Sequence, residues 1–152
     1  MRRLVLPVAT VGGIGYLPGA PGTAASLLVL PFVPWIAVLR ARAPGSFVLL
    51  LIVVMLVSIW AAARAELALG RHDDGCVVID EVAGMVTAAS FVPPTWIAAV
   101  LVFAAFRLFD IWKPQPIGLL DRHVGGGLGV VADDVVAGIY AGLLTLAVLW
   151  VL

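Results

Sequence analysis

Charged residues are scarce in this chain, and their scarcity excludes most classes of soluble protein. Only 12% of its 152 residues are charged and 63% are hydrophobic, whereas soluble domains carry roughly 25% charged residues. Nine basic and nine acidic residues leave no net charge, so nothing in the composition favours binding to DNA or RNA. The single cysteine, Cys76, excludes an internal disulfide framework. The composition therefore indicates an integral membrane protein.

Long apolar segments predict one membrane-embedded domain over residues 1–152. A helix needs about 20 mostly apolar residues to cross the hydrocarbon core of a bilayer. The segments that qualify on length are 47–63, 95–109 and 135–152, and the shorter ones are 24–39 and 77–92. Pro31 and Pro34 predict a kinked or tilted helix over 24–39. We expect an all-α bundle of about five hydrophobic helices, some short or re-entrant, with polar loops on the cytoplasmic face.

The basic residues predict the orientation of these helices. With five spans, one face of the membrane receives Arg2, Arg3, Arg64, Arg71, Arg107, Lys113 and Arg122, and the other receives Arg40 and Arg42. Because cytoplasmic loops are enriched in arginine and lysine, the N-terminus is expected in the cytoplasm.

All the acidic residues fall between Glu66 and Asp134, which the five-span arrangement places at or just inside that same cytoplasmic face. A carboxylate at the centre of a membrane helix costs about 2.5–3.5 kcal/mol on insertion scales, so acids in or beside spans mark function by default. A one-sided set of carboxylates is poorly explained as accident.

Two adjacent acidic pairs, Asp80-Glu81 and Asp133-Asp134, open two of the hydrophobic segments. Neighbouring side chains on a helix diverge by about 100°, so only one member of the first pair is expected to point directly into a shared site. The alternative is structural, with acids complementing a helix dipole and Asp133 acting as an N-cap. Converging carboxylates suit a hard divalent cation such as Mg²⁺. The predicted metal ligands are Asp80, Glu81, Asp133 and Asp134.

Glycines predict close helix packing and turns. Gly84 lies on the same helical face as Asp80, and Gly138-x-x-x-Gly142 follows the second acidic pair, so both patterns favour close approach of another helix. The glycine-rich stretches 12–15 and 124–129 match neither phosphate-binding glycine motif, and we interpret them as turns.

The segment 107–121 carries basic groups next to acidic ones. Arg107 and Asp110 are three residues apart and form either a structural ion pair or part of a phosphate-binding site. Lys113 stands where Pro114 ends the helix. His72 and His123 are candidates for acid–base assistance on the same polar face.

Missing motifs narrow the chemistry further. No Cys-x5-Arg loop, Asp-x-Asp-x-Thr/Val motif or histidine-nucleophile setting is present, which leaves attack by water assisted by a metal. A CDP-alcohol phosphotransferase is disfavoured because no Ala-Arg follows Asp74-Gly75 at the required spacing. An ion transporter stays open as a non-enzymatic alternative, although its acids should be distributed through the membrane depth.

Three stretches together form a specific signature: GIGYLPGAPGTAASL, RHDDGCVVIDEVAGM and FRLFDIWKPQPIGLLDRHVGGGLGVVADDVVAG. With them the chain resembles the phosphatidylglycerophosphatase A family of bacterial inner-membrane lipid phosphatases. The resemblance implies Mg²⁺-dependent hydrolysis of phosphatidylglycerophosphate to phosphatidylglycerol and phosphate, by a multi-pass protein whose active site faces the cytoplasm. Its partners would then be the phospholipid substrate and the membrane, without nucleic acid.

The resemblance also implies which residues form the site. Those expected to be catalytic are Asp80, Glu81, Arg107, Asp110, Lys113, Asp133 and Asp134. Those expected to bind substrate are Thr23, Ser26, His72, Asp121 and Gly126.

Overall fold

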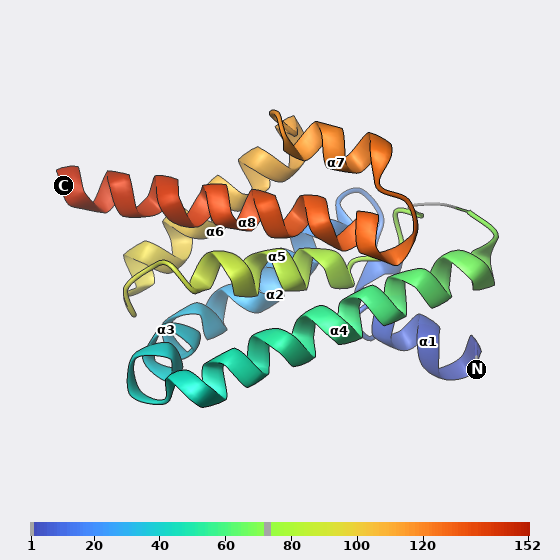
Figure 1. The fold of residues 1–152 in the computed structure, drawn as a ribbon, viewed down its shortest axis with the longest axis horizontal. Coiled ribbons are helices and arrows are strands. Elements are labelled where there is room, and N and C mark those ends of the chain that lie inside the picture. Colours follow the sequence, from blue (N-terminus) through green and yellow to red (C-terminus); the bar gives the residue numbers. More distant parts are fainter. Residues whose placement is uncertain (1, 72–73) are drawn as a thin grey trace.

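A computed structural model describes residues 2–71 and 74–152, and within these residues all regular structure is helical (Figure 1). The elements are α1 (Arg2–Ala9), η1 (Ile14–Tyr16), α2 (Pro21–Val29), η2 (Leu30–Phe32), α3 (Val33–Arg42), α4 (Pro44–Leu69), α5 (Ile79–Ala89), α6 (Trp96–Trp112), α7 (Ile117–His123) and α8 (Gly126–Val151). The predicted all-α class is confirmed.

Helix α8 packs against four other helices, α4, α5, α6 and α7 (Figure 1). Glycines allow the closest of these contacts. A Cβ at Gly84 would lie 2.8 Å from the carbonyl oxygen of Asp134 and 2.5 Å from the Phe106 ring, and a Cβ at Gly138 would collide with the carbonyl oxygen of Gly84. The predicted close approach at Gly84 and Gly138 is therefore confirmed, and it brings the acidic parts of α5 and α8 together.

Three helical segments of the described chain are long and apolar enough to cross a membrane: Pro21–Arg42, Pro44–Leu69 and Gly126–Val151. The first is interrupted by the 3-10 turn η2 at Pro31, as the two prolines predict. The other two predicted spans are shorter. Helix α5 has 11 residues and α6 has 17, or about 17 Å and 26 Å at the rise of an α-helix, against a hydrocarbon core of about 30 Å.

Helix α8 begins nine residues before the predicted segment 135–152. The expectation that Asp133 is an N-cap is therefore wrong, because Asp133 and Asp134 lie inside the helix and are buried. The interpretation of 124–129 as a turn is wrong for most of its length. Residues 126–129 form the start of α8, where Gly127 lets the helix approach the backbone of α4 closely.

The acidic residues gather at one end of the bundle, to the right in Figure 1, where α4 ends and α5 and α8 begin. The opposite end holds the basic end of α3, where Arg40 Nη1 donates to the carbonyl oxygen of Ser90 at 2.7 Å. The described acids thus show the predicted one-sidedness. The side of the membrane that they face stays a prediction.

Candidate active site

A polar cavity of about 150 Å³ opens at the acidic end of the bundle, between α5, α6, α7 and α8. The charged residues that line it are Asp80, Glu81, Asp110, Lys113, Asp121, Asp133 and Asp134. Six of the seven residues predicted to be catalytic therefore share one cavity. The seventh, Arg107, lies beside it and contacts two of the lining carboxylates.

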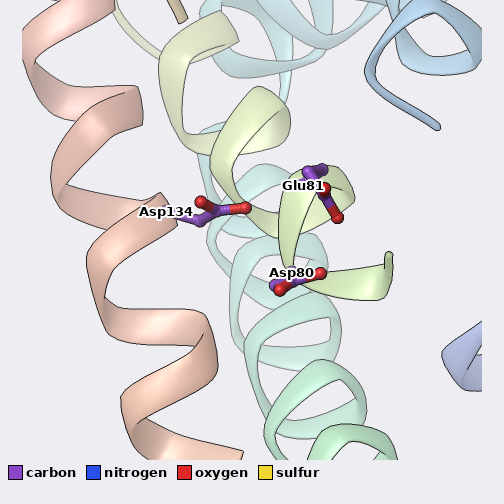
Figure 2. A group of neighbouring side chains, drawn as sticks. All are labelled: Asp80, Glu81 and Asp134. Carbon is purple, nitrogen blue, oxygen red and sulfur yellow. The ribbon is translucent and has the colours of Figure 1, made fainter. Parts of the chain in front are cut away.

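Three carboxylates converge within this cavity, and we call Asp80, Glu81 and Asp134 the acid triad (Figure 2). Each offers one oxygen atom, and the three oxygens lie within 4.8 Å of one another. The expectation that only Asp80 or Glu81 points into the site is wrong. Both belong to the first turn of α5, where side chains lean back toward the open N-terminal end of the helix, so both reach the same space.

The triad has oxygen atoms that no neighbouring group satisfies. Asp80 Oδ1, Glu81 Oε2 and Asp134 Oδ2 are buried and have no hydrogen-bond partner among the described residues. Removing carboxylates from water without partners is costly, and a bound cation offsets that cost. Carboxylate oxygens from three converging residues are also the kind of donor set that Mg²⁺ prefers. The residues present therefore fit a divalent cation.

Lys113 connects two further acids, and we call Lys113, Asp121 and Asp133 the lysine bridge. Its Nζ donates to Asp121 Oδ1 at 2.5 Å and to Asp133 Oδ2 at 2.8 Å. Burial lowers the pKa of Lys113, but the hydrogen bonds and charges of the two carboxylates outweigh burial and raise its pKa above the usual value. The ammonium is therefore charged at neutral pH. Asp133 lies outside the triad, and its role as a metal ligand stays a prediction.

Arg107 organises the third part of the site. Its Nη1 lies 2.5 Å from Asp110 Oδ2 and 4.0 Å from Glu81 Oε1, so the predicted ion pair with Asp110 is present. It also donates to Ser26 Oγ at 3.5 Å, and Ser26 Oγ donates to the carbonyl oxygen of Gly22 at 2.8 Å. Ser26 is fully buried, so the structure places it behind Arg107, while its contact with substrate stays a prediction.

The other predicted residues lie around this core. Thr23 is in the first turn of α2, next to Gly22, and Gly126 begins α8 without lining the cavity. His123 is exposed on α7, with Nδ1 3.0 Å from the carbonyl oxygen of Leu119. His72 lies outside the described residues.

Two positions escaped the sequence analysis. A Cβ at Gly22 would collide with Glu81 Oε1, so α2 lies directly against the Glu81 carboxylate, and any larger residue would require that side chain to shift. Ser58 Oγ of α4 donates to the carbonyl oxygen of Ile79 at 3.2 Å and fixes the start of α5 beside Asp80. Ser58 is a polar residue in an otherwise apolar run, a signal that could have identified it.

The loop that precedes α5 gives a test of this geometry that needs no assumption about function. The backbone N–H of Cys76 donates to Asp74 Oδ1 at 3.1 Å, and this hydrogen bond holds the pKa of Asp74 below its usual value. Burial, with the nearby Asp74 carboxylate, raises the pKa of the Cys76 thiol to about 11. Alkylation of this sole cysteine at pH 8 is expected to be about 100-fold slower than that of an unperturbed thiol, because the thiolate is the nucleophile. Asp74→Asn should accelerate the reaction, and an unperturbed rate in the wild-type protein would contradict this loop structure.

Apolar helices long enough to cross a membrane, with a buried carboxylate cluster and two cations at one end, define a helical membrane protein with a site suited to metal-assisted phosphate chemistry. The family model for phosphatidylglycerophosphatase A matches residues 7–149 of the chain. The chain belongs to this family and is an enzyme of it, as the sequence resemblance implied.

Three curated relatives are similar over most of their length. The phosphatidylglycerophosphatase A of Escherichia coli (strain K12) is 34% identical, over 87% of this chain and 76% of the relative. That of Haemophilus influenzae is 32% identical, over 90% of this chain and 83% of the relative. A Bacteroides thetaiotaomicron protein named "Putative phosphatidylinositol-3-phosphatase" is 37% identical, over 99% and 98% of the two chains. No solved structure matches.

Proposed function

We propose that this protein hydrolyses the terminal phosphomonoester of phosphatidylglycerophosphate to give phosphatidylglycerol and inorganic phosphate, with Mg²⁺ as cofactor. The observation that carries the proposal is the acid triad: each member has a buried oxygen without a hydrogen-bond partner in the described part of the chain, and all three line a cavity that also holds Lys113. Two relatives that carry the name phosphatidylglycerophosphatase A support the choice of substrate.

Asp80, Glu81 and Asp134 would hold the metal, because one oxygen from each converges and each residue has a buried oxygen without a hydrogen-bond partner among the described residues. A divalent cation bound there would polarise a phosphoryl oxygen and lower the pKa of a coordinated water. None of the described residues that line the cavity is serine, cysteine or histidine. The described lining therefore offers no hydroxyl, thiol or imidazole nucleophile, and because its carboxylates are assigned to the metal and to the two cations, direct attack by water is the proposed route.

Arg107 and Lys113 would offset the negative charge that develops on the phosphoryl group. Asp110 holds the guanidinium of Arg107 at 2.5 Å and so orients it beside Glu81. Asp133 accepts a hydrogen bond from Lys113 through Oδ2. Only the other, buried oxygen of Asp133, Oδ1, could therefore approach a metal. Lys113 has three N–H donors, and the two carboxylates of the lysine bridge occupy two of them.

The position of the site suits a lipid substrate. The cavity lies at one end of the bundle, so a headgroup could enter it while the acyl chains remain beside the helices. Thr23, Gly126, Asp121 and His72 are proposed to contact the headgroup. We further propose a five-helix arrangement in the inner membrane of a bacterium, in which the short helix α5 is re-entrant and the site faces the cytoplasm.

A second substrate is favoured by one comparison. The Bacteroides relative, whose name refers to phosphatidylinositol 3-phosphate, is similar over nearly the whole of both chains. Both lipids present a phosphomonoester on a glycerophospholipid headgroup, and they differ in the alcohol that carries it. The family match supports neither of the two alternative functions, the CDP-alcohol phosphotransferase and the ion transporter.

Phosphate release by the detergent-purified protein tests the proposal. We expect release from phosphatidylglycerophosphate with Mg²⁺, and its loss with EDTA. Phosphatidylinositol 3-phosphate and phosphatidic acid, assayed in parallel, should react at least about 10-fold more slowly, because a site that hydrogen-bonds one headgroup leaves polar groups unpaired with another. Preference for the inositol lipid would transfer the proposal to the second substrate. Failure of folded protein to release phosphate from any of the three lipids would contradict the proposed phosphatase activity.

A further inference from the structure

Lys113 is the only lysine among the nine basic residues of the chain, and the other eight are arginines. The two side chains are not equivalent. Arginine presents a planar fork, whereas lysine places a compact ammonium with three donors at one point. Among the described residues, Lys113 is the one cation that lines the cavity, and every other basic residue of the chain is an arginine. This choice indicates that the site needs a compact positive charge there.

Apart from Asp110, which pairs with Arg107, the carboxylates around the cavity form two groups that separate between Asp133 and Asp134. Asp134 joins the acid triad, and Asp133, which leaves α8 in another direction, accepts from Lys113. Asp133 is 5% exposed, and its Oδ1 has no hydrogen-bond partner among the described residues. Metal-dependent phosphatases often place two cations about 3.5–4 Å apart, one for each side of the phosphoryl group. In this protein the second group of carboxylates, Asp121 and Asp133, already binds the positive charge of Lys113.

We infer that the site takes a single divalent cation, in the acid triad, and that the Lys113 ammonium occupies the position of the second cation, between Asp121 and Asp133. This inference rests on the metal-dependent function proposed above. The ammonium lies 2.5 Å and 2.8 Å from the two carboxylate oxygens, and its remaining N–H is available to a phosphoryl oxygen. It thus supplies charge without exchangeable coordination sites, and one divalent ion suffices.

The backbone holds Lys113 in this place. Lys113 ends α6 with φ of 46°, in the left-handed region that non-glycine residues rarely adopt. A Cβ at Gly118 would lie 2.8 Å from the carbonyl oxygen of Lys113, so α7 packs directly on this residue. An ordinary surface lysine would not be fixed between two helices in this way, and the ammonium is therefore built into the site.

Binding of Mn²⁺ alone to detergent-purified protein, measured by electron paramagnetic resonance as bound ions per chain, tests the inference. We expect one ion in the wild type. Lys113→Met removes the ammonium, leaves Asp121 and Asp133 unneutralised, and should bind a second ion at least about 10-fold more weakly than the first, since the vacated site keeps fewer carboxylates. Lys113→Arg keeps a cation and should bind one ion. Adding Asp121→Asn to Lys113→Met should abolish the second ion.

The number of Mn²⁺ ions bound per chain decides whether the single-cation inference holds. Two ions in the wild type, or one ion in folded Lys113→Met, would overturn the inference while leaving a metal-dependent phosphatase intact. No Mn²⁺ in the folded wild type would overturn both the inference and the proposed cofactor. If Lys113→Met does not fold, the wild-type stoichiometry decides alone. As a readout of a different kind, phosphate release by Lys113→Met should depend on a higher power of the Mg²⁺ concentration than release by the wild type.

Discussion

Changing Asp134 to asparagine is expected to lower phosphate release by at least about 100-fold, the range seen when one electrostatic group that stabilises a transition state is removed. Asp134 is 4% exposed, supplies one of the three convergent oxygens, and has a buried Oδ2 without a partner in the described chain. An amide has the same shape but no charge, so the triad loses a third of its negative charge. The same variant should therefore also lose Mn²⁺ binding, measured by electron paramagnetic resonance.

The neighbouring residue gives a matched comparison for Asp134→Asn. Asp133→Asn makes the same chemical change one position away, but it acts on the lysine bridge. Because the triad is left whole, Mn²⁺ binding should persist, and phosphate release should fall about 10–100-fold, as when a group that positions a ligand is lost. Asp74→Asn, at a loop position that does not line the cavity, keeps a hydrogen-bond acceptor for Cys76 and should retain wild-type activity. Equal loss of Mn²⁺ binding in the Asp133 and Asp134 variants would contradict the division between triad and lysine bridge.

The two acidic pairs show how much of the site can be predicted from the sequence. That Asp80, Glu81, Asp133 and Asp134 belong together follows from their positions beside apolar segments, since buried carboxylates need a common partner. Which of them meet does not follow. The 100° divergence separates Asp133 from Asp134, which lie inside α8 and beyond its first turn. It fails for Asp80 and Glu81, because the first turn of α5 leaves both side chains free to lean toward the helix end.

The helix boundaries show a similar limit. Prolines predicted the interruption of the first long apolar segment, because their effect on the backbone is local. The early start of α8 was missed, because its glycines signal a turn when only local conformation is considered. Gly127 lies inside the helix, and only glycine fits there because α4 approaches too closely for any side chain. Tertiary packing, which a single sequence does not display, decides such positions.

Gly138→Ala is expected to destabilise the protein by about 1–3 kcal/mol, the usual cost of overpacking a filled interior. Its new methyl group would collide with the carbonyl oxygen of Gly84, which belongs to the backbone of α5 and can move only with the helix. Separation of α5 from α8 also separates Asp80 from Asp134, so Mn²⁺ affinity should fall together with the thermal unfolding temperature measured in detergent.

The same substitution at Gly45 is the control for Gly138→Ala. Gly45 lies in the first turn of α4, and a Cβ there meets no atom within 4 Å. Alanine favours a helix over glycine by up to about 1 kcal/mol, so Gly45→Ala should unfold at the wild-type temperature or above and bind Mn²⁺ normally. Were Gly138→Ala equally stable, the α5–α8 contact could not be as close as described. A loss of stability without a loss of Mn²⁺ affinity would show that the geometry of the triad does not depend on this contact.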